Sequence, residues 1–170
     1  MSQLKVNSIV PVGGLPSGAN GGIIQCVQTV KTDTTSQSLT GSSNFFDISG
    51  MSVSITPSSN SNKILVLATV SVANNDGNTN TFIQLRRGST DIAKGTGGSS
   101  TNGSFFHKTR DGFSPENITL HFLDSPATTS ATTYKVRWSG ESGDTYFLNR
   151  NASNTNEGMV SVITVMEVTV

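Results

Sequence analysis

The longest apolar run in the chain, residues 63–73 (KILVLATVSVA), constrains the fold more than any other segment. In an extended strand, successive side chains point to opposite faces. One face of this run would carry Ile64, Val66, Ala68, Val70 and Val72. Leu65 and Leu67 share the other face, which continues with Thr69 and Ser71. We therefore expect a central strand with one face in the core, whose first half also meets another strand layer or another subunit.

Shorter extended segments recur along the chain and are separated by polar turns. Charged residues make up only 13% of the sequence, glycine occurs 17 times, and no window has the apolar period of a helix. The segments lie at residues 23–30, 45–48, 51–56, 81–88, 104–110, 117–124, 133–140, 145–150 and 159–170. This pattern predicts an all-β fold, an antiparallel β-sandwich of jelly-roll type formed by residues 23–170.

Three local features refine this prediction. Trp138 alternates with Lys135 and Arg137, so it should point into the core. The closing strand, residues 159–170, is too apolar for an exposed edge and should lie inside a sheet beside the strand that starts at Ile23. The sequence of residues 74–78 (NNDGN) contains an Asp-Gly pair between two strands, which predicts a hairpin.

Residues 1–22 differ from the rest of the chain, because prolines and glycines interrupt any regular element there. We expect an extended attachment arm that needs a partner surface for its apolar side chains. An unstructured leader is the alternative. The side chains that would dock are Leu4, Val6, Ile9, Val10, Val12 and Leu15.

Charge and composition argue against several classes of partner. Eleven basic residues balance eleven acidic ones, so we expect no nucleic-acid partner, and no apolar run approaches the roughly 20 residues of a membrane span. A lightly charged surface favours self-association. Cys26 is the only cysteine, which rules out a disulfide within the chain.

No residue pattern indicates catalysis, a cofactor or a metal site. His107 and His121 lie in separate strand segments, and the carboxylates are scattered over turns. We therefore expect a protein that is not an enzyme. Aromatic side chains near loops are the better indication of binding. The candidates for contact with a receptor are Phe105, Phe106, Phe113 and Tyr146.

Several longer motifs resemble those of small virion proteins of marine bacteriophages, including cyanophages. They are LKVNSIVPVGG (residues 4–14), SGANGGIIQ (17–25), MSVSITPSSNSNKILV (51–66), RGSTDIA (87–93), FLDSPATTSATTYKV (122–136) and SVITVMEV (161–168). The resemblance implies a tail-fibre or fibre-like protein on the surface of a virion, with other phage structural proteins as partners. The strand order is also similar to the trimeric jelly rolls of the tumour-necrosis-factor and complement globular-head type. In that fold the first and last strands lie side by side.

These observations lead to three hypotheses for the function. The first is a trimeric adhesin that docks by its arm and binds a host glycan or protein through residues 94–111 and 140–158. The second is a capsid decoration protein, and the third is a polysaccharide depolymerase. For the trimer interface we expect the apolar side chains that a single sandwich has difficulty burying, which are Leu65, Leu67, Ile163 and Val165.

Overall fold

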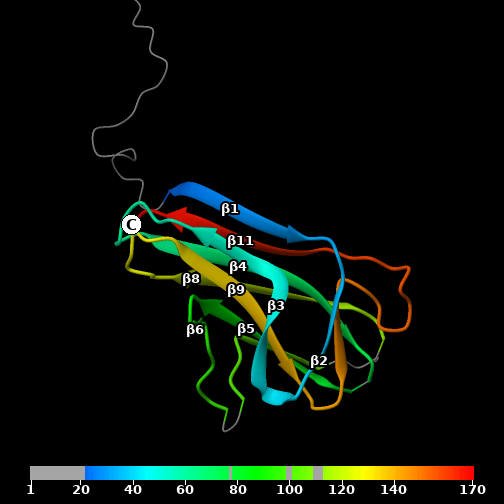
Figure 1. Ribbon diagram of the computed structural model, residues 1–170. Coiled ribbons are helices and arrows are strands. Elements are labelled where there is room, and N and C mark those ends of the chain that lie inside the picture. Colours follow the sequence, from blue (N-terminus) through cyan, green and yellow to red (C-terminus); the bar gives the residue numbers. More distant parts are fainter. Residues whose placement is uncertain (1–21, 77, 99–100, 109–112) are drawn as a thin grey trace, which may run out of the picture.

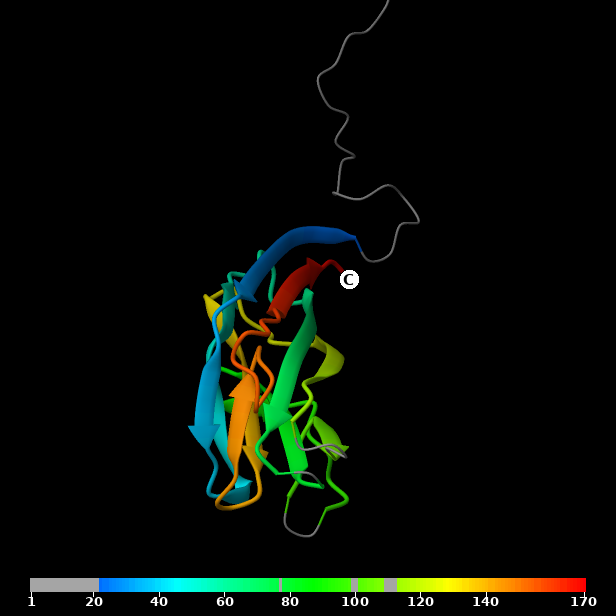
Figure 2. The same cartoon turned by 90° about the vertical axis from the view of Figure 1, so that its right-hand side faces the viewer.

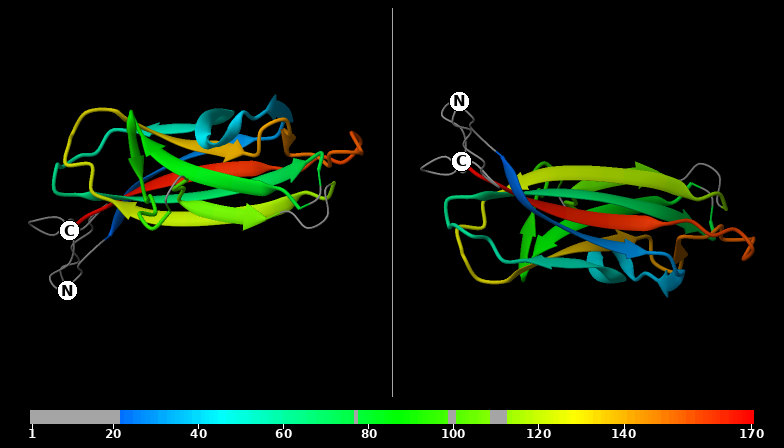
Figure 3. Two further views of the ribbon diagram at one scale, coloured as in Figure 1. Left: turned by 90° about the horizontal axis from the view of Figure 1, so that it is seen from below. Right: turned by 90° about the horizontal axis from the view of Figure 1, so that it is seen from above.

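The protein is a sandwich of two antiparallel β-sheets, seen in a computed structural model that describes residues 22–76, 78–98, 101–108 and 113–170 (Figures 1 and 3). The described residues form eleven strands and no helix, which confirms the predicted all-β class. The strands are β1 (Ile23–Lys31), β2 (Thr35–Ser38), β3 (Gly41–Ile55), β4 (Lys63–Asn74), β5 (Asn80–Arg87), β6 (Thr90–Ile92), β7 (Phe105–Lys108), β8 (Glu116–Asp124), β9 (Thr132–Gly140), β10 (Thr145–Leu148) and β11 (Ser161–Val168). No helix long and apolar enough to cross a membrane occurs in this part of the chain.

The first sheet, which we call sheet I, is built around β4. Strand β11 pairs with one side of β4 and β8 with the other, while β1 pairs with the far side of β11. The short strand β10 pairs with the last residues of β4 and with β2. Sheet II has the order β3-β9-β5-β6, and β7 also pairs with β5.

The alternation predicted for residues 63–73 is confirmed as far as Val70, whereas Ser71, which we expected on the more exposed face, is buried. Ile64, Val66 and Val70 are completely buried between the sheets, while Leu65 and Leu67 lie partly exposed on the outer face of sheet I. Burial of one such aliphatic side chain contributes roughly 1.5–3 kcal/mol to stability. Trp138 of β9 is also completely buried, as its alternation indicates, and its indole N–H donates to the side-chain oxygen of Gln37.

The closing strand lies inside sheet I, between β1 and β4, as expected. Its register, however, points Ile163 and Val165 into the core, where both are completely buried. The prediction that these two residues form a subunit interface is therefore wrong. Val162 and Met166 alternate with them and face outward. The interface prediction therefore assigned the two faces of β11 the wrong way round.

The turn after β4 is a crossover between the sheets and not a hairpin, which corrects the prediction from its Asp-Gly pair. β4 belongs to sheet I and β5 to sheet II. The backbone N–H of Asn75 donates to the Thr145 carbonyl of β10, and the Thr145 N–H donates to Oδ1 of Asn75. These bonds hold the start of the turn against sheet I, while the chain leaves toward sheet II.

Both ends of the described domain lie at the same end of the sandwich. The backbone N–H of Thr169 donates to the Gly22 carbonyl at 3.0 Å, and the Gly22 N–H donates to Oγ1 of Thr169. Figures 1 and 2 show this end at the top, whereas the loop that follows β6 lies at the bottom. Gly22 and Thr169 therefore lie at the end of the sandwich far from that loop.

Candidate functional site

The outer face of sheet II carries a network of opposite charges. Asp47 of β3 contacts Lys135 at 2.8 Å and Arg137 at 3.0 Å, both from β9. Arg137 also contacts Asp91 of β6 at 3.4 Å, and Asp91 lies 3.8 Å from Arg86 of β5. Partial burial raises the pKa of Asp47, but the hydrogen bond from Lys135 and the charges of Lys135 and Arg137 outweigh it, so the pKa lies below 3.8.

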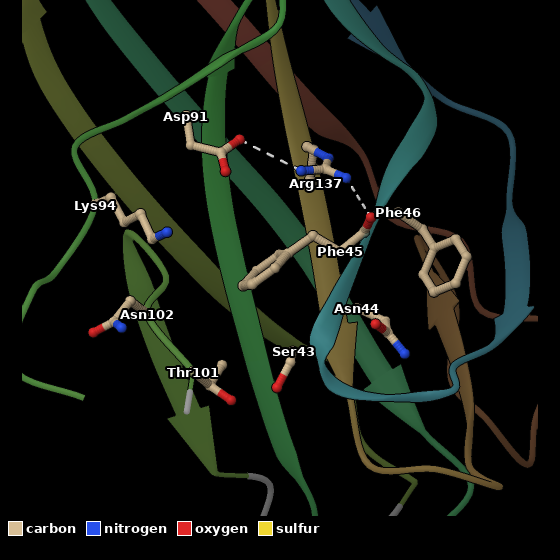
Figure 4. A pocket seen from close by; sticks show the side chains of 9 residues that line it. All are labelled: Ser43, Asn44, Phe45, Phe46, Asp91, Lys94, Thr101, Asn102 and Arg137. Carbon is tan, nitrogen blue, oxygen red and sulfur yellow. Dashed lines mark hydrogen bonds and ion pairs between the residues drawn. The ribbon is translucent and has the colours of Figure 1, made fainter. Parts of the chain in front are cut away.

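A polar hollow of about 440 Å³ opens beside this network (Figure 4). We call it the Phe45 hollow. Its walls come from the first half of β3, from the chain that follows β5 and from β9, so three separate segments form it. The lining residues are Ser43, Asn44, Phe45, Phe46, Asp91, Lys94, Thr101, Asn102 and Arg137.

Arg137 and Phe45 form the centre of the hollow. A guanidinium N–H of Arg137 donates to the backbone carbonyl of Phe45, and the guanidinium carbon lies 5.9 Å from the centre of the Phe45 ring. Figure 4 shows the ring of Phe45 projecting into the hollow, away from the ring of Phe46. Phe46 instead packs against the core. Adjacent residues of a strand face opposite sides, so one of the two phenylalanines has to leave the core.

The loop after β6 forms the opposite wall and is held by its own hydrogen bonds. The side-chain oxygen of Asn102 accepts from the Gly98 N–H at 2.8 Å, and its amide donates to the Gly98 carbonyl. The hydroxyl of Thr101 donates to that of Ser42 in β3 at 3.0 Å. This bond ties the loop to β3, the wall that carries Phe45, and so fixes the width of the hollow.

Lys94 supplies the one cationic group of the lining that no partner satisfies. Its ammonium has neither an ion pair nor a hydrogen bond to any residue that the structure describes, and Figure 4 shows it at the rim of the hollow. Arg137, in contrast, is engaged by Asp47, Asp91 and Phe45. Lys94 is therefore available to an external ligand, whereas Arg137 holds the site together.

An aromatic groove of about 300 Å³ continues from the hollow and shares Thr101 and Asn102 with it. Phe105 and Phe106 of β7 line this groove and are 42% and 52% exposed. The rings of Phe106 and Phe82 lie 5.0 Å apart in a tilted arrangement. The structure thus brings two of the predicted receptor residues to the edge of the hollow.

The other two predicted receptor residues lie elsewhere. Phe113 is 48% exposed, but it does not line the hollow or the groove, and its carbonyl accepts from the Ala152 N–H. Tyr146 is completely buried in β10, which corrects its assignment to a receptor loop. Its hydroxyl donates to the Asn80 carbonyl and accepts from the Glu141 N–H. The docking residues predicted in the arm, Leu4 to Leu15, lie outside the described residues.

Phe45, Lys94 and Arg137 were not among the site residues that we expected from the sequence. For Phe45 a usable indication was present, because two adjacent phenylalanines in one strand cannot both enter the core. Lys94 opens the loop that we expected to bind a receptor. For Arg137 only the outward position was predictable, since its partners Asp47 and Asp91 are distant in sequence.

The outer face of sheet I differs sharply from that of sheet II. Three rows of four residues cross β1, β11, β4 and β8 in register. None of the twelve is an aspartate, glutamate, lysine or arginine. The rows are Val30–Val162–Thr69–Thr119, Gln28–Thr164–Leu67–His121 and Cys26–Met166–Leu65–Leu123. We call this surface the uncharged face. Val30 is 50% exposed and Leu123 46% exposed on it.

Titratable side chains elsewhere in the described chain form small groups. His107 of β7 and Glu116 of β8 make a contact of 2.7 Å that joins the two sheets. Within the part of the chain that the structure describes, no three His, Cys, Asp or Glu side chains come together as metal ligands would. The Phe45 hollow, with its adjoining groove, is therefore the candidate site.

The described residues thus form an all-β sandwich with a polar hollow on the outer face of one sheet and the uncharged face on the other. No family model matches the chain, and no curated protein matches it.

Proposed function

We propose that the protein is a trimeric adhesin of a bacteriophage particle, a jelly roll of the tumour-necrosis-factor and complement globular-head type. It docks to the virion through the segment that precedes β1 and binds the host surface through sheet II. The observation that carries this proposal is the contrast between the two outer faces. The outer face of sheet II holds an ionic network and the hollow, whereas that of sheet I has no charged residue in its central rows.

The uncharged face supports self-association. Leu65 and Leu67 lie beside Met166 and Thr164 of β11 and beside Leu123 and His121 of β8. Contact between this surface and a second copy is energetically favourable, because it removes apolar area from water without desolvating a charged side chain. In a closed threefold ring, one part of this face on each copy would contact a different part of the face on the next copy.

The strand arrangement supports the jelly-roll assignment. β1, β11, β4 and β8 lie side by side in sheet I, opposite β3, β9 and β5 in sheet II. The chain passes between the sheets six times, from β2 to β3, β3 to β4, β4 to β5, β7 to β8, β8 to β9 and β9 to β10. The first and last described strands are neighbours, as in the trimeric jelly rolls.

The positions of the two ends of the described domain support a display function. The domain begins and ends at one end of the sandwich, and the loop that lines the hollow lies at the other (Figures 1 and 2). Attachment at the first end would point the hollow away from the particle. Three linked copies would convert a weak contact at each hollow into firm adsorption.

Sedimentation equilibrium tests the trimer. We expect a mass three times the 17.8 kDa of the chain. Leu65→Glu should produce a monomer with an unchanged far-ultraviolet spectrum, because it places a charge in the proposed interface. Ser52→Glu, on the exposed outer side of β3, is the matched control and should remain trimeric. A monomeric wild-type protein at micromolar concentration would refute the trimer.

Competition for adsorption tests the adhesin function. The purified trimer, added to host cells before the phage, should reduce phage adsorption in proportion to its concentration. Reduced head stability without the protein, together with undiminished adsorption, would instead assign it to capsid decoration and overturn our proposal.

A further inference from the structure

The Phe45 hollow has an excess of positive charge. The ionic network beside it contains two carboxylates, Asp47 and Asp91, and three cations, Arg86, Lys135 and Arg137. Lys94 adds a fourth cation. Unlike the other three, Lys94 contacts no carboxylate of the described residues. The potential in the hollow therefore favours a ligand with a negative charge.

The hollow also offers an apolar wall next to this charge. The ring of Phe45 projects into it (Figure 4), and the carbonyl and ring of Phe45 both contact Arg137, which fixes the ring's position. The face of an aromatic ring is electron-rich, so it attracts weakly positive C–H groups. A sugar ring carries such C–H groups on one face and hydroxyls at its rim.

The remaining lining groups suit the hydroxyls of a sugar. Asn44 and Asn102 contribute amides, and Thr101 contributes a hydroxyl, all in segments that hydrogen bonds already hold in place. A ligand would therefore order few side chains on binding, which limits the entropic cost. The volume of about 440 Å³ is within the usual range of small-molecule sites.

We propose that the Phe45 hollow binds an anionic sugar, with its acidic group on the Lys94 ammonium and its ring against Phe45. The acidic group is a carboxylate or a sulfate ester, since both accept charge-assisted hydrogen bonds from an ammonium. Arg137 is a positioning residue that holds Phe45 and Asp91. This inference rests on the proposed adhesin function and names the chemistry of its receptor.

Calorimetric titration of the purified full-length protein with three trisaccharides tests the proposal. The probes are trigalacturonate, a sulfated galactotriose and neutral galactotriose. We expect at least one acidic probe to bind, the neutral probe to bind on the order of tenfold more weakly, and the difference to shrink in high salt. The acidic probe that binds identifies the group as a carboxylate or a sulfate ester.

Two pairs of variants locate the site. Lys94→Gln should weaken the acidic probe on the order of tenfold, while Lys108→Gln, which removes the same charge from an exposed position outside the hollow, should not. Phe45→Leu should weaken binding, while Phe113→Leu, at an exposed phenylalanine outside the hollow, should not. Circular dichroism confirms that each variant is folded.

Three results would overturn the inference: no binding of either acidic probe at millimolar concentration, equal binding of the neutral probe, or unchanged affinity in folded Lys94→Gln. These results are separate from the adsorption experiment. A protein that blocks adsorption but binds no acidic sugar is an adhesin for another receptor. A protein that binds acidic sugar but does not block adsorption refutes the adhesin function alone.

Discussion

Glu167 in the last strand accepts a hydrogen bond of 2.7 Å from the side-chain amide of Asn62, which lies 105 residues earlier. Oε1 of Glu167 also accepts from the backbone N–H and the hydroxyl of Ser58, each at 2.7 Å. The carboxylate is almost completely buried. It therefore holds the turn that leads into β4 against β11, the strand that pairs with β4.

We predict that Glu167→Gln lowers the free energy of unfolding by about 1–3 kcal/mol. The glutamine amide has the same shape as the carboxylate, but it lacks the negative charge that strengthens these hydrogen bonds. Its N–H groups would also face the donors of Asn62 and Ser58, which already fill the site. Urea unfolding followed by tryptophan fluorescence measures the change. Glu157→Gln, at an exposed position, is the control and should unfold at the wild-type urea concentration. Equal midpoints for both variants would contradict the role of Glu167.

Stability should fall in acid, in part through the same carboxylate. Burial raises the pKa of Glu167, but the hydrogen bonds from Asn62 and Ser58 outweigh it, so the folded-state pKa lies below 4.5. A lowered pKa adds stability that is complete above the unfolded-state value and is lost as the pH falls through the folded-state value. Thermal melts between pH 7 and pH 3 should show the loss below roughly pH 4.5. The loss should be smaller in Glu167→Gln, and parallel curves would exclude Glu167 as a source.

The two tyrosines of the chain should not ionise while the protein is folded. Burial raises the pKa of Tyr134, and the hydrogen bond that it donates to Asp124 at 2.7 Å raises it further. Burial also raises the pKa of Tyr146. Because only the unfolded state ionises near pH 10, folding stability decreases as the pH rises above that value.

Absorbance at the tyrosinate band gives the test. We predict that no tyrosinate forms at pH 10, and that both side chains then ionise together with alkaline unfolding, followed in parallel by circular dichroism. Ionisation of one tyrosine in the folded protein would show that its side chain is accessible.

Gly140 should not tolerate a side chain. A Cβ at this position would overlap the ring of Tyr146, whose hydroxyl is fixed by Asn80 and Glu141. We predict that Gly140→Ala lowers the free energy of unfolding by about 1–3 kcal/mol through overpacking. Gly158→Ala, where a Cβ would meet no atom within 4 Å, is the control and should change stability by less than about 0.5 kcal/mol. Equal urea midpoints for the two variants would show that the ring moves aside freely.

The sequence predicted the parts of the fold that depend on alternation along one strand. Around Trp138, apolar and polar side chains alternate clearly enough to assign each face without knowledge of the neighbouring strands. In residues 63–73 one face is apolar throughout, whereas the other face becomes polar at Thr69, and this difference assigns the core face. The prediction failed for Ile163, Val165 and Tyr146, where adjacent residues on both faces are apolar. There only the register with the neighbouring strands decides which residues enter the core.

The candidate site depended on tertiary structure to a greater extent. From the order of residues alone we could predict an all-β chain, the inward face of its central strand, and a receptor loop that begins at residue 94. The order of residues could not determine that the strand after β4 belongs to the opposite sheet, because a turn motif specifies a local bend and not the partner of the next strand. Phe45, Lys94 and Arg137 belong to segments far apart in the chain, so only the pairing of β3 with β9 and of β9 with β5 brings them to one hollow.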